Sequence, residues 1–180
     1  PQGTRYGANA LAGLINFSTN EPGEDFFTSV KLTAGEFGAQ TAGGVLNLPL
    51  SETFLSRFVF ESHESDGYVE NDFLDSDTTN DRDELTSRAK FSWQVKKNWS
   101  LNLSLASIDI DNGYDAFSLD NNRHTLSDEP GFDRQNSAYV SLKSSWQLDE
   151  MNIEVLWNQS GSDLDYGYDE DWSFTGIHPF

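Results

Sequence analysis

Apolar and polar side chains alternate along most of the chain after about residue 25, which predicts β-strands and not helices. In residues 85–95, for example, Phe91 and Trp93 fall on one face of an extended strand, and Arg88 and Lys90 fall on the other. The pattern recurs in seven segments: residues 26–34, 39–50, 54–61, 85–95, 99–107, 137–147 and 151–157. Strands of roughly 9–11 residues have the length of a tilted membrane-spanning strand.

The connections between these strands alternate between short and long. Three are tight turns: residues 50–53, 96–98 and 148–150. Three are long and polar: residues 63–84, 109–134 and 161–180. An up-and-down antiparallel sheet with this spacing has its tight turns at one end and its long loops at the other, with the short hairpin at residues 35–38 as the exception.

Charge follows the same division. The chain has 30 acidic and 11 basic residues, and the three long segments hold 21 of the acidic and 3 of the basic ones. The net charge of −19 therefore belongs to the loops, and the strands are nearly neutral. This acidity disfavours nucleic acid as a partner, because the chain could not neutralise phosphates. The absence of cysteine excludes disulfides and thiolate metal sites.

Four aromatic residues lie beside the tight turns, each on the apolar face of its strand: Phe54, Trp93, Trp99 and Trp146. An indole is apolar and carries one N–H donor, so a row of such residues is typical of a membrane–water interface. We therefore predict that these four are membrane-interface aromatics.

The alternation by itself leaves two folds open, a membrane β-barrel and a soluble β-sandwich, since both have one apolar face. The two-sided loop lengths and the aromatic row favour the barrel. Charged residues in the middle of the polar faces also favour it, because they suit a wet interior: Arg57, Glu61, Arg88, Lys90 and Lys143.

The first residues carry a recognisable motif. The run PQGTRYGANALAGLINF resembles the end of the plug domain of TonB-dependent outer-membrane receptors, in which Arg-Gly-Pro-x-Gly-x-x-Tyr-Gly leads to a Gly-Gly-x-Ile-Asn strand. The matching plug-motif positions are Pro1, Gly3, Tyr6, Gly7, Gly13, Ile15 and Asn16. The chain departs by having Ala12-Gly13 for the glycine pair and Glu21-Pro22 at the exit. Residues 67–73 and 80–85 resemble the first long outside loop of these receptors.

The resemblance covers essentially the whole chain and implies a fold and a domain division. Residues 1–24 would be the C-terminal end of the plug and its exit linker, and residues 25–180 the N-terminal part of the barrel. The expected fold is all-β, an antiparallel transmembrane β-barrel segment with about seven of the 22 strands of plugged transporters. The chain is expected to begin inside the plug motif and to end within an outside loop.

The resemblance also implies a function, the import of a scarce extracellular ligand across the bacterial outer membrane. A ferric siderophore, cobalamin or a carbohydrate would be such a ligand. Energy would come from the TonB complex, through a segment outside this chain, and the outer-membrane lipid would be the other partner. No enzymatic activity and no cofactor are expected. The alternatives are a passive outer-membrane porin or adhesin barrel, and a soluble carbohydrate-binding β-sandwich.

Aromatic residues in the outside segments are the predicted ligand-binding residues. Rigid rings on loops suit ligand capture, and packing of the loops against each other is the competing interpretation. The candidates are Tyr6, Tyr114, Tyr166, Tyr168 and Trp172, with Phe117 and Phe174 in the same segments. Arg5 is expected to pair with a wall carboxylate such as Glu61.

Metal ligands and catalytic groups are not predicted. His63, His124 and His178 fall in separate predicted loops without metal-ligand spacing. The acidic runs at residues 75–77 and 109–113 do not follow the order of a calcium-binding EF-hand loop. Bridging of divalent ions to lipopolysaccharide by the acidic loops stays open.

Overall fold

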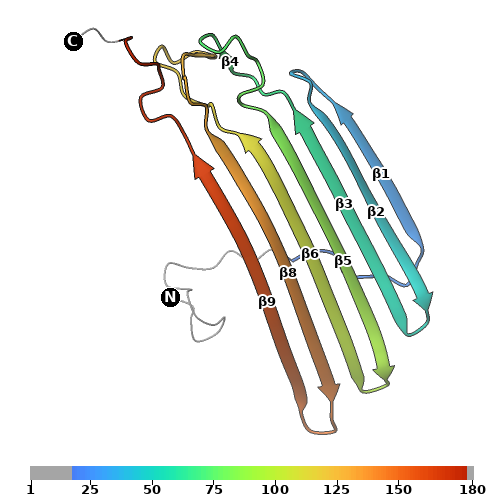
Figure 1. Ribbon diagram of the computed structural model, residues 1–180. Helices are drawn as coiled ribbons and strands as arrows, with labels where there is room; N and C mark the ends of the chain where they lie inside the picture. Colours follow the sequence, from blue (N-terminus) through green and yellow to red (C-terminus); the bar gives the residue numbers. More distant parts are fainter. Residues whose placement is uncertain (1–17, 178–180) are drawn as a thin grey trace.

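The computed structural model describes residues 18–177, and this range contains strands and no helix. Seven strands form one sheet: β1 (Phe27–Ala34), β2 (Gln40–Ser51), β3 (Phe54–Ser65), β5 (Arg82–Lys96), β6 (Trp99–Gly113), β8 (Phe132–Gln147) and β9 (Asn152–Gly167). Each pairs with the next in antiparallel fashion, so their spatial order follows the chain (Figure 1). The all-β class and the seven-stranded antiparallel sheet are confirmed.

Residues 18–177 include no helix long and apolar enough to cross a membrane. Two further short strands, β4 (Glu70–Asn71) and β7 (His124–Thr125), form a separate parallel pair. They belong to the two longest described connections of the sheet and join them side by side.

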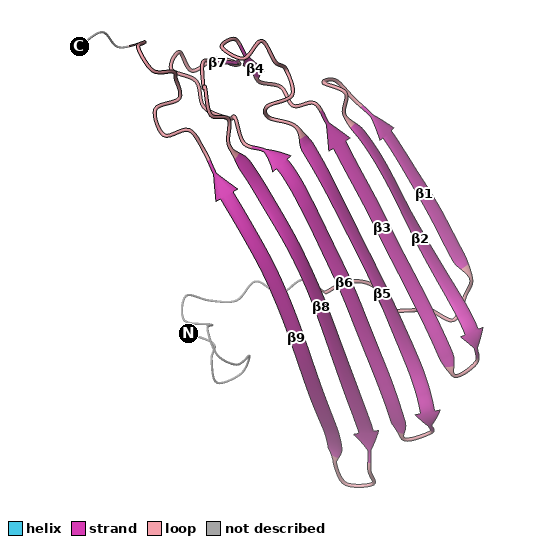
Figure 2. Cartoon of the chain, viewed as in Figure 1, coloured by secondary structure: helices cyan, strands magenta, loops and turns pink. Residues whose placement is uncertain are grey.

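The tight turns lie at one end of the sheet, here called the turn end, and the longer connections lie at the other, the loop end (Figure 2). The turn-end connections are residues 52–53, 97–98 and 148–151. The loop-end connections are residues 35–39, 66–81 and 114–131. The predicted two-sided arrangement of the connections is therefore confirmed. Register shifts at Pro49/Ser51 and Gln94/Lys96 fall beside two of the tight turns.

The strands are longer than predicted, which corrects the predicted loops. The four strands from β5 onward have 15 or 16 residues and extend into segments that the polar composition assigned to loops. Polar pairs hold these extensions together at the loop end. Arg134 Nε donates to Asp111 Oδ1 at 2.7 Å, and Asn136 Nδ2 donates to Asp109 Oδ2 at 2.9 Å. Neighbouring strands stay paired beyond the point where the apolar alternation stops. Composition alone therefore predicted the loop-end boundaries of these strands too early.

The sheet has an apolar face and a polar face. Opposite partners in the register point to the same side, and Leu105, Val140 and Leu142 define the apolar face of β6 and β8. Phe91 packs there between Phe54 and Phe58, with ring centroids at 6.0 and 5.6 Å. The polar face includes Arg57 and Lys90 on β3 and β5, which are register partners, and Ser104, Ser141 and Lys143 on β6 and β8.

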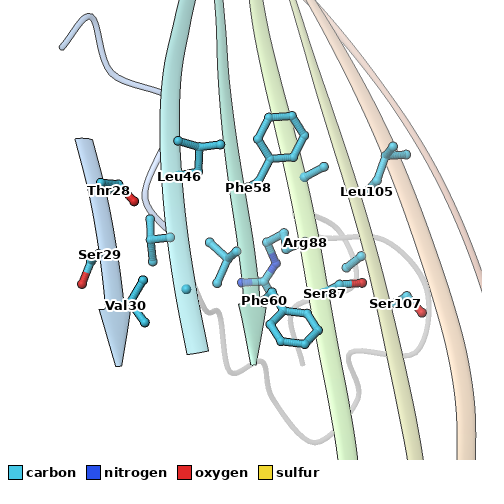
Figure 3. Close-up of a pocket in the computed structure, with 15 residues that line it drawn as sticks. Thr28, Ser29, Val30, Leu46, Phe58, Phe60, Ser87, Arg88, Leu105 and Ser107 are labelled. Atoms are coloured by element: carbon cyan, nitrogen blue, oxygen red, sulfur yellow. The ribbon is translucent and has the colours of Figure 1, made fainter. Parts of the chain in front are cut away.

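No second layer covers the apolar face within residues 18–177. Val69 is the one buried hydrophobic residue of this range, and Val30 and Leu32 are 75% and 78% exposed. A hollow of about 550 Å³ on this face lies between Leu46, Phe58, Phe60 and Leu105 (Figure 3). The described sheet is not closed, and β1 and β9 are its two edges. A single layer cannot bury its own apolar face, so this surface is exposed within the described range.

Candidate ligand-binding site

The segment before β1 lies against the polar face of the sheet, where Asn47 and Lys90 bind it. The Asn47 side chain is 2% exposed; it accepts from Gly23 N at 2.8 Å and donates to Gly23 O and Asp25 O at 2.9 and 2.6 Å. Lys90 Nζ lies 2.6 Å from Glu21 Oε1 and donates to Thr19 O at 3.1 Å. Paired charges and hydrogen bonds are what buried polar side chains require.

Five aromatic side chains form a connected cluster at the loop end: Tyr114, Phe117, Tyr166, Tyr168 and Trp172. Phe117 stacks on Trp172 with ring centroids 5.1 Å apart, and Tyr114 meets Tyr166 edge-on at 5.0 Å. Tyr166, Tyr168 and Trp172 are 54%, 45% and 37% exposed. The cluster therefore packs the connections together and still presents aromatic surface to solvent. The ligand-binding role of these rings stays a prediction.

Tyr166 places one ring of the cluster on the polar face. Tyr166 is the register partner of Asp133. Side chains at alternate positions of a strand point to the same face, so Tyr166 and Ser162 of β9 lie on one face of the sheet. Ser162 Oγ is 2.7 Å from Ser137 Oγ, on the side of the sheet that carries Lys143. Tyr166 thus lies at the loop end on the same side of the sheet as the segment before β1.

A buried polar network fixes the connection that carries Tyr114 and Phe117. The Asp115 carboxylate is 4% exposed and accepts from Asn71 Nδ2 and from Thr79 Oγ1, both at 2.7 Å. Asn71, 1% exposed, also donates to Ser127 O at 2.9 Å. These bonds join residues 66–81 to residues 114–131, so the aromatic cluster is held by a defined scaffold.

The pKa of Tyr166 is raised to about 12, chiefly by the side-chain hydrogen bond with Tyr114 and further by partial desolvation. Tyr166 lies at the loop end of β9, beyond its apolar stretch. A raised pKa means that folding favours the neutral phenol. This contribution to loop stability is present below about pH 10 and is lost as the pH rises through about 12.

Tyr114→Phe is therefore expected to shift the titration of Tyr166 downward, from about 12 toward the ordinary value of 10.0. The measurement is the ultraviolet absorbance of tyrosinate as a function of pH in two variants, Tyr114→Phe and the control Tyr68→Phe. The two titration curves are then subtracted. Tyr68 is an exposed tyrosine outside the cluster. Identical titration of the remaining tyrosines in both variants would contradict the hydrogen bond.

The structure brings together four of the five predicted ligand-binding residues, and the fifth, Tyr6, lies outside the described range. Sequence reasoning kept Phe117 out of the predicted set, although it is the central ring of the cluster. Phe117 follows Tyr114 by three residues in an aromatic-rich connection, and this position could have indicated that it belongs to the cluster. The plug-motif residues and Arg5 also lie outside residues 18–177, so their predicted roles stay predictions.

The predicted interface aromatics form two pairs at the turn end. Phe54 and Trp93 are register partners with ring centroids 6.4 Å apart, and Trp99 and Trp146 are partners stacked at 6.2 Å. Trp99 Nε1 donates to Ser144 Oγ at 3.0 Å. The geometry groups these rings beside the tight turns, and their role at a membrane interface stays a prediction.

Two histidines do not lie as predicted. His63 is on β3, where its Nδ1 is 2.9 Å from Thr41 Oγ1, because β3 continues to Ser65, four residues past the predicted segment 54–61. His124 is on β7, and the parallel pairing with β4 sets it directly beside Glu70. The predicted acidic loop at residues 109–113 is the loop end of β6. His178 lies outside the described residues.

Comparisons with protein-family models, with curated proteins and with solved structures return no match for this chain. The resemblance to TonB-dependent receptors therefore rests on the sequence motifs, above all on the opening residues. The described sheet and its aromatic cluster supply the independent physical observations that bear on function.

Proposed function

We propose that this chain is part of a TonB-dependent outer-membrane transporter, which binds a scarce extracellular ligand and imports it into the periplasm. In this proposal the seven-stranded sheet is a portion of a membrane-spanning barrel. Residues 1–24 belong to the plug, and energy arrives from the TonB complex through a segment outside this chain.

The observation that carries the proposal is the uncovered apolar face of the sheet. It runs from the aromatic pairs at the turn end to the carboxylates at the loop end, including Asp109 and Asp111 on the same face. Lipid satisfies such a face, and water does not. The opposite face carries Lys90, Arg57 and Lys143, which a plugged aqueous interior accommodates.

The segment of residues 18–24 supports the plugged form over a passive porin. It is bound to the polar face through Asn47 and Lys90, on the side that a barrel would enclose. A strand edge at β1 and another at β9 would pair with further strands in a closed barrel.

The aromatic cluster supports ligand capture at the extracellular loops. Exposed ring faces suit the rings of a carbohydrate or the planar groups of a siderophore. Asp169 follows Tyr168 in the sequence, Asp133 is the register partner of Tyr166, and the connections are strongly acidic. A neutral or cationic ligand therefore fits this surface better than a highly anionic one.

The test is ion conductance of the full-length protein in a planar lipid bilayer, with potassium chloride as the probe. The wild-type protein is expected to insert and to remain closed, because a plug blocks the lumen. Deletion of residues 6–13 is expected to leave insertion intact and to open a pore. A conducting wild-type protein would favour the passive porin, and a protein that stays in the soluble fraction would favour the sandwich.

A further inference from the structure

Glu70, Asp72 and His124 place three ligand atoms together at the loop end, although the chain separates Asp72 from His124 by 52 positions. One oxygen of each carboxylate and one ring nitrogen of the histidine lie within 4.8 Å of one another. His124 Nδ1 is 3.1 Å from Asp72 Oδ1 and 3.7 Å from Glu70 Oε2. All three side chains are exposed, so an ion could reach them.

The backbone around these side chains is held firmly. Glu70 N donates to Arg123 O at 2.8 Å, and Asp72 N donates to Thr125 O at 2.9 Å, which continues the β4–β7 pairing. Asn71, between them in the sequence, is buried in its polar network. Because neighbouring side chains of a strand point to opposite sides, Glu70 and Asp72 share the side opposite Asn71. His124 N donates to Asn122 Oδ1 at 2.8 Å.

The spacing matches a metal centre. Zinc–ligand bonds of about 2.0–2.1 Å at tetrahedral angles place neighbouring ligand atoms about 3.3 Å apart, and the two measured separations from His124 Nδ1 fall on either side of this value. The imidazole distinguishes this group from the acidic runs elsewhere in the loops. A donor set of one nitrogen and two oxygens suits divalent transition metals and suits calcium less well.

We propose that Glu70, Asp72 and His124 bind a divalent transition-metal ion, for which Zn²⁺ is the test case. Three protein ligands leave at least one coordination position for water or another donor. The ion would join residues 66–81 to residues 114–131, the two connections that also meet through the residue pairs of β4 and β7 and through the hydrogen bonds of Asn71 and Thr79. Binding would stabilise the loop end by RT ln(1 + c/Kd), where c is the metal concentration, so the stabilisation grows with the logarithm of the metal concentration above the Kd. This proposal is independent of transport.

The experiment is a calorimetric titration of the full-length protein in detergent with zinc chloride, in excess calcium to occupy weak acidic sites. Asp72→Asn and His124→Gln remove one ligand each. His63→Gln and Asp75→Asn are the matched controls, because His63 is bonded to Thr41 and Asp75 is an exposed acid in the same connection as Asp72. Circular dichroism of every variant confirms that the sheet is retained.

We expect one zinc ion per chain in the wild-type protein and in both controls. In Asp72→Asn and His124→Gln the Kd should rise at least about tenfold, since even outer-shell substitutions cost roughly 10–100-fold. X-ray absorption at the zinc edge should show one imidazole nitrogen among oxygen ligands. An equal loss of affinity in controls and ligand variants, or no saturable binding, would overturn the proposal and leave His124 as an ion-pair partner of Asp72.

Discussion

Val140→Arg is expected to prevent stable insertion of the protein into lipid. Val140 is the register partner of Leu105 on the apolar face, near the middle of the stretch between Trp146 and Asn136. An arginine facing lipid at this depth costs about 2–4 kcal/mol, a large part of the stability of an ordinary domain. The measurement is the urea dependence of folding of the full-length protein into lipid vesicles.

Tyr139→Arg is the matched control. Tyr139 is the neighbouring residue, pairs with Ala106 and lies on the polar face with 41% exposure. In the proposed barrel a charge there would contact a wet interior, so the expected change is within about 0.5 kcal/mol. If the two substitutions have equal effects on folding into lipid, the apolar face is not the lipid-facing surface and the proposed transporter is wrong.

Asn47→Ala is expected to detach residues 18–25 from the sheet. The substitution removes three hydrogen bonds from a side chain that is 2% exposed. At about 1 kcal/mol each, their loss amounts to about 3 kcal/mol, or about a hundredfold faster amide exchange. Hydrogen exchange of the peptide that contains Gly23 and Asp25 measures this directly. In the proposed transporter the same change should loosen the connection between plug and wall.

Asn158→Ala provides the comparison, because Asn158 is exposed on β9, far along the sheet from the segment before β1. Exchange at Gly23 should be unchanged in that variant. Unchanged exchange in Asn47→Ala as well would mean that Lys90 and its contacts to Glu21 and Thr19 hold the segment without help.

The metal proposal and the aromatic cluster share one structural origin, the meeting of two connections at the loop end. Asn71 and Asp115 hold these connections together, and Phe73 stacks on Phe174 with ring centroids 4.7 Å apart. The Arg123 guanidinium also lies 5.5 Å from the centre of the Phe37 ring, in the hairpin between β1 and β2. The connection of residues 114–131 thus carries one of the proposed metal-binding residues, His124, and two rings of the aromatic cluster, Tyr114 and Phe117.

Alternation along the chain was sufficient to predict the strands, their antiparallel order and the turn end. The reason is physical: a half-buried strand repeats every two residues, and a tight turn forces neighbours in sequence to pair. The pairings of Phe54 with Trp93 and of Trp99 with Trp146 join strands that the long connections link, so the register of the sheet sets them and no short turn does. Local sequence therefore determined the sheet and its two faces.

Tertiary structure decided where the strands end and which loop residues meet. The polar pair of Asp111 and Arg134 extends β6 and β8 beyond the apolar pattern, and composition does not distinguish such a pair from a loop. Tyr114 reaches Tyr166, and His124 reaches Asp72, through connections whose path depends on buried groups such as Asn71. Contacts between residues so far apart in the sequence leave no periodic pattern in it, because they depend on how the sheet places its connections next to one another.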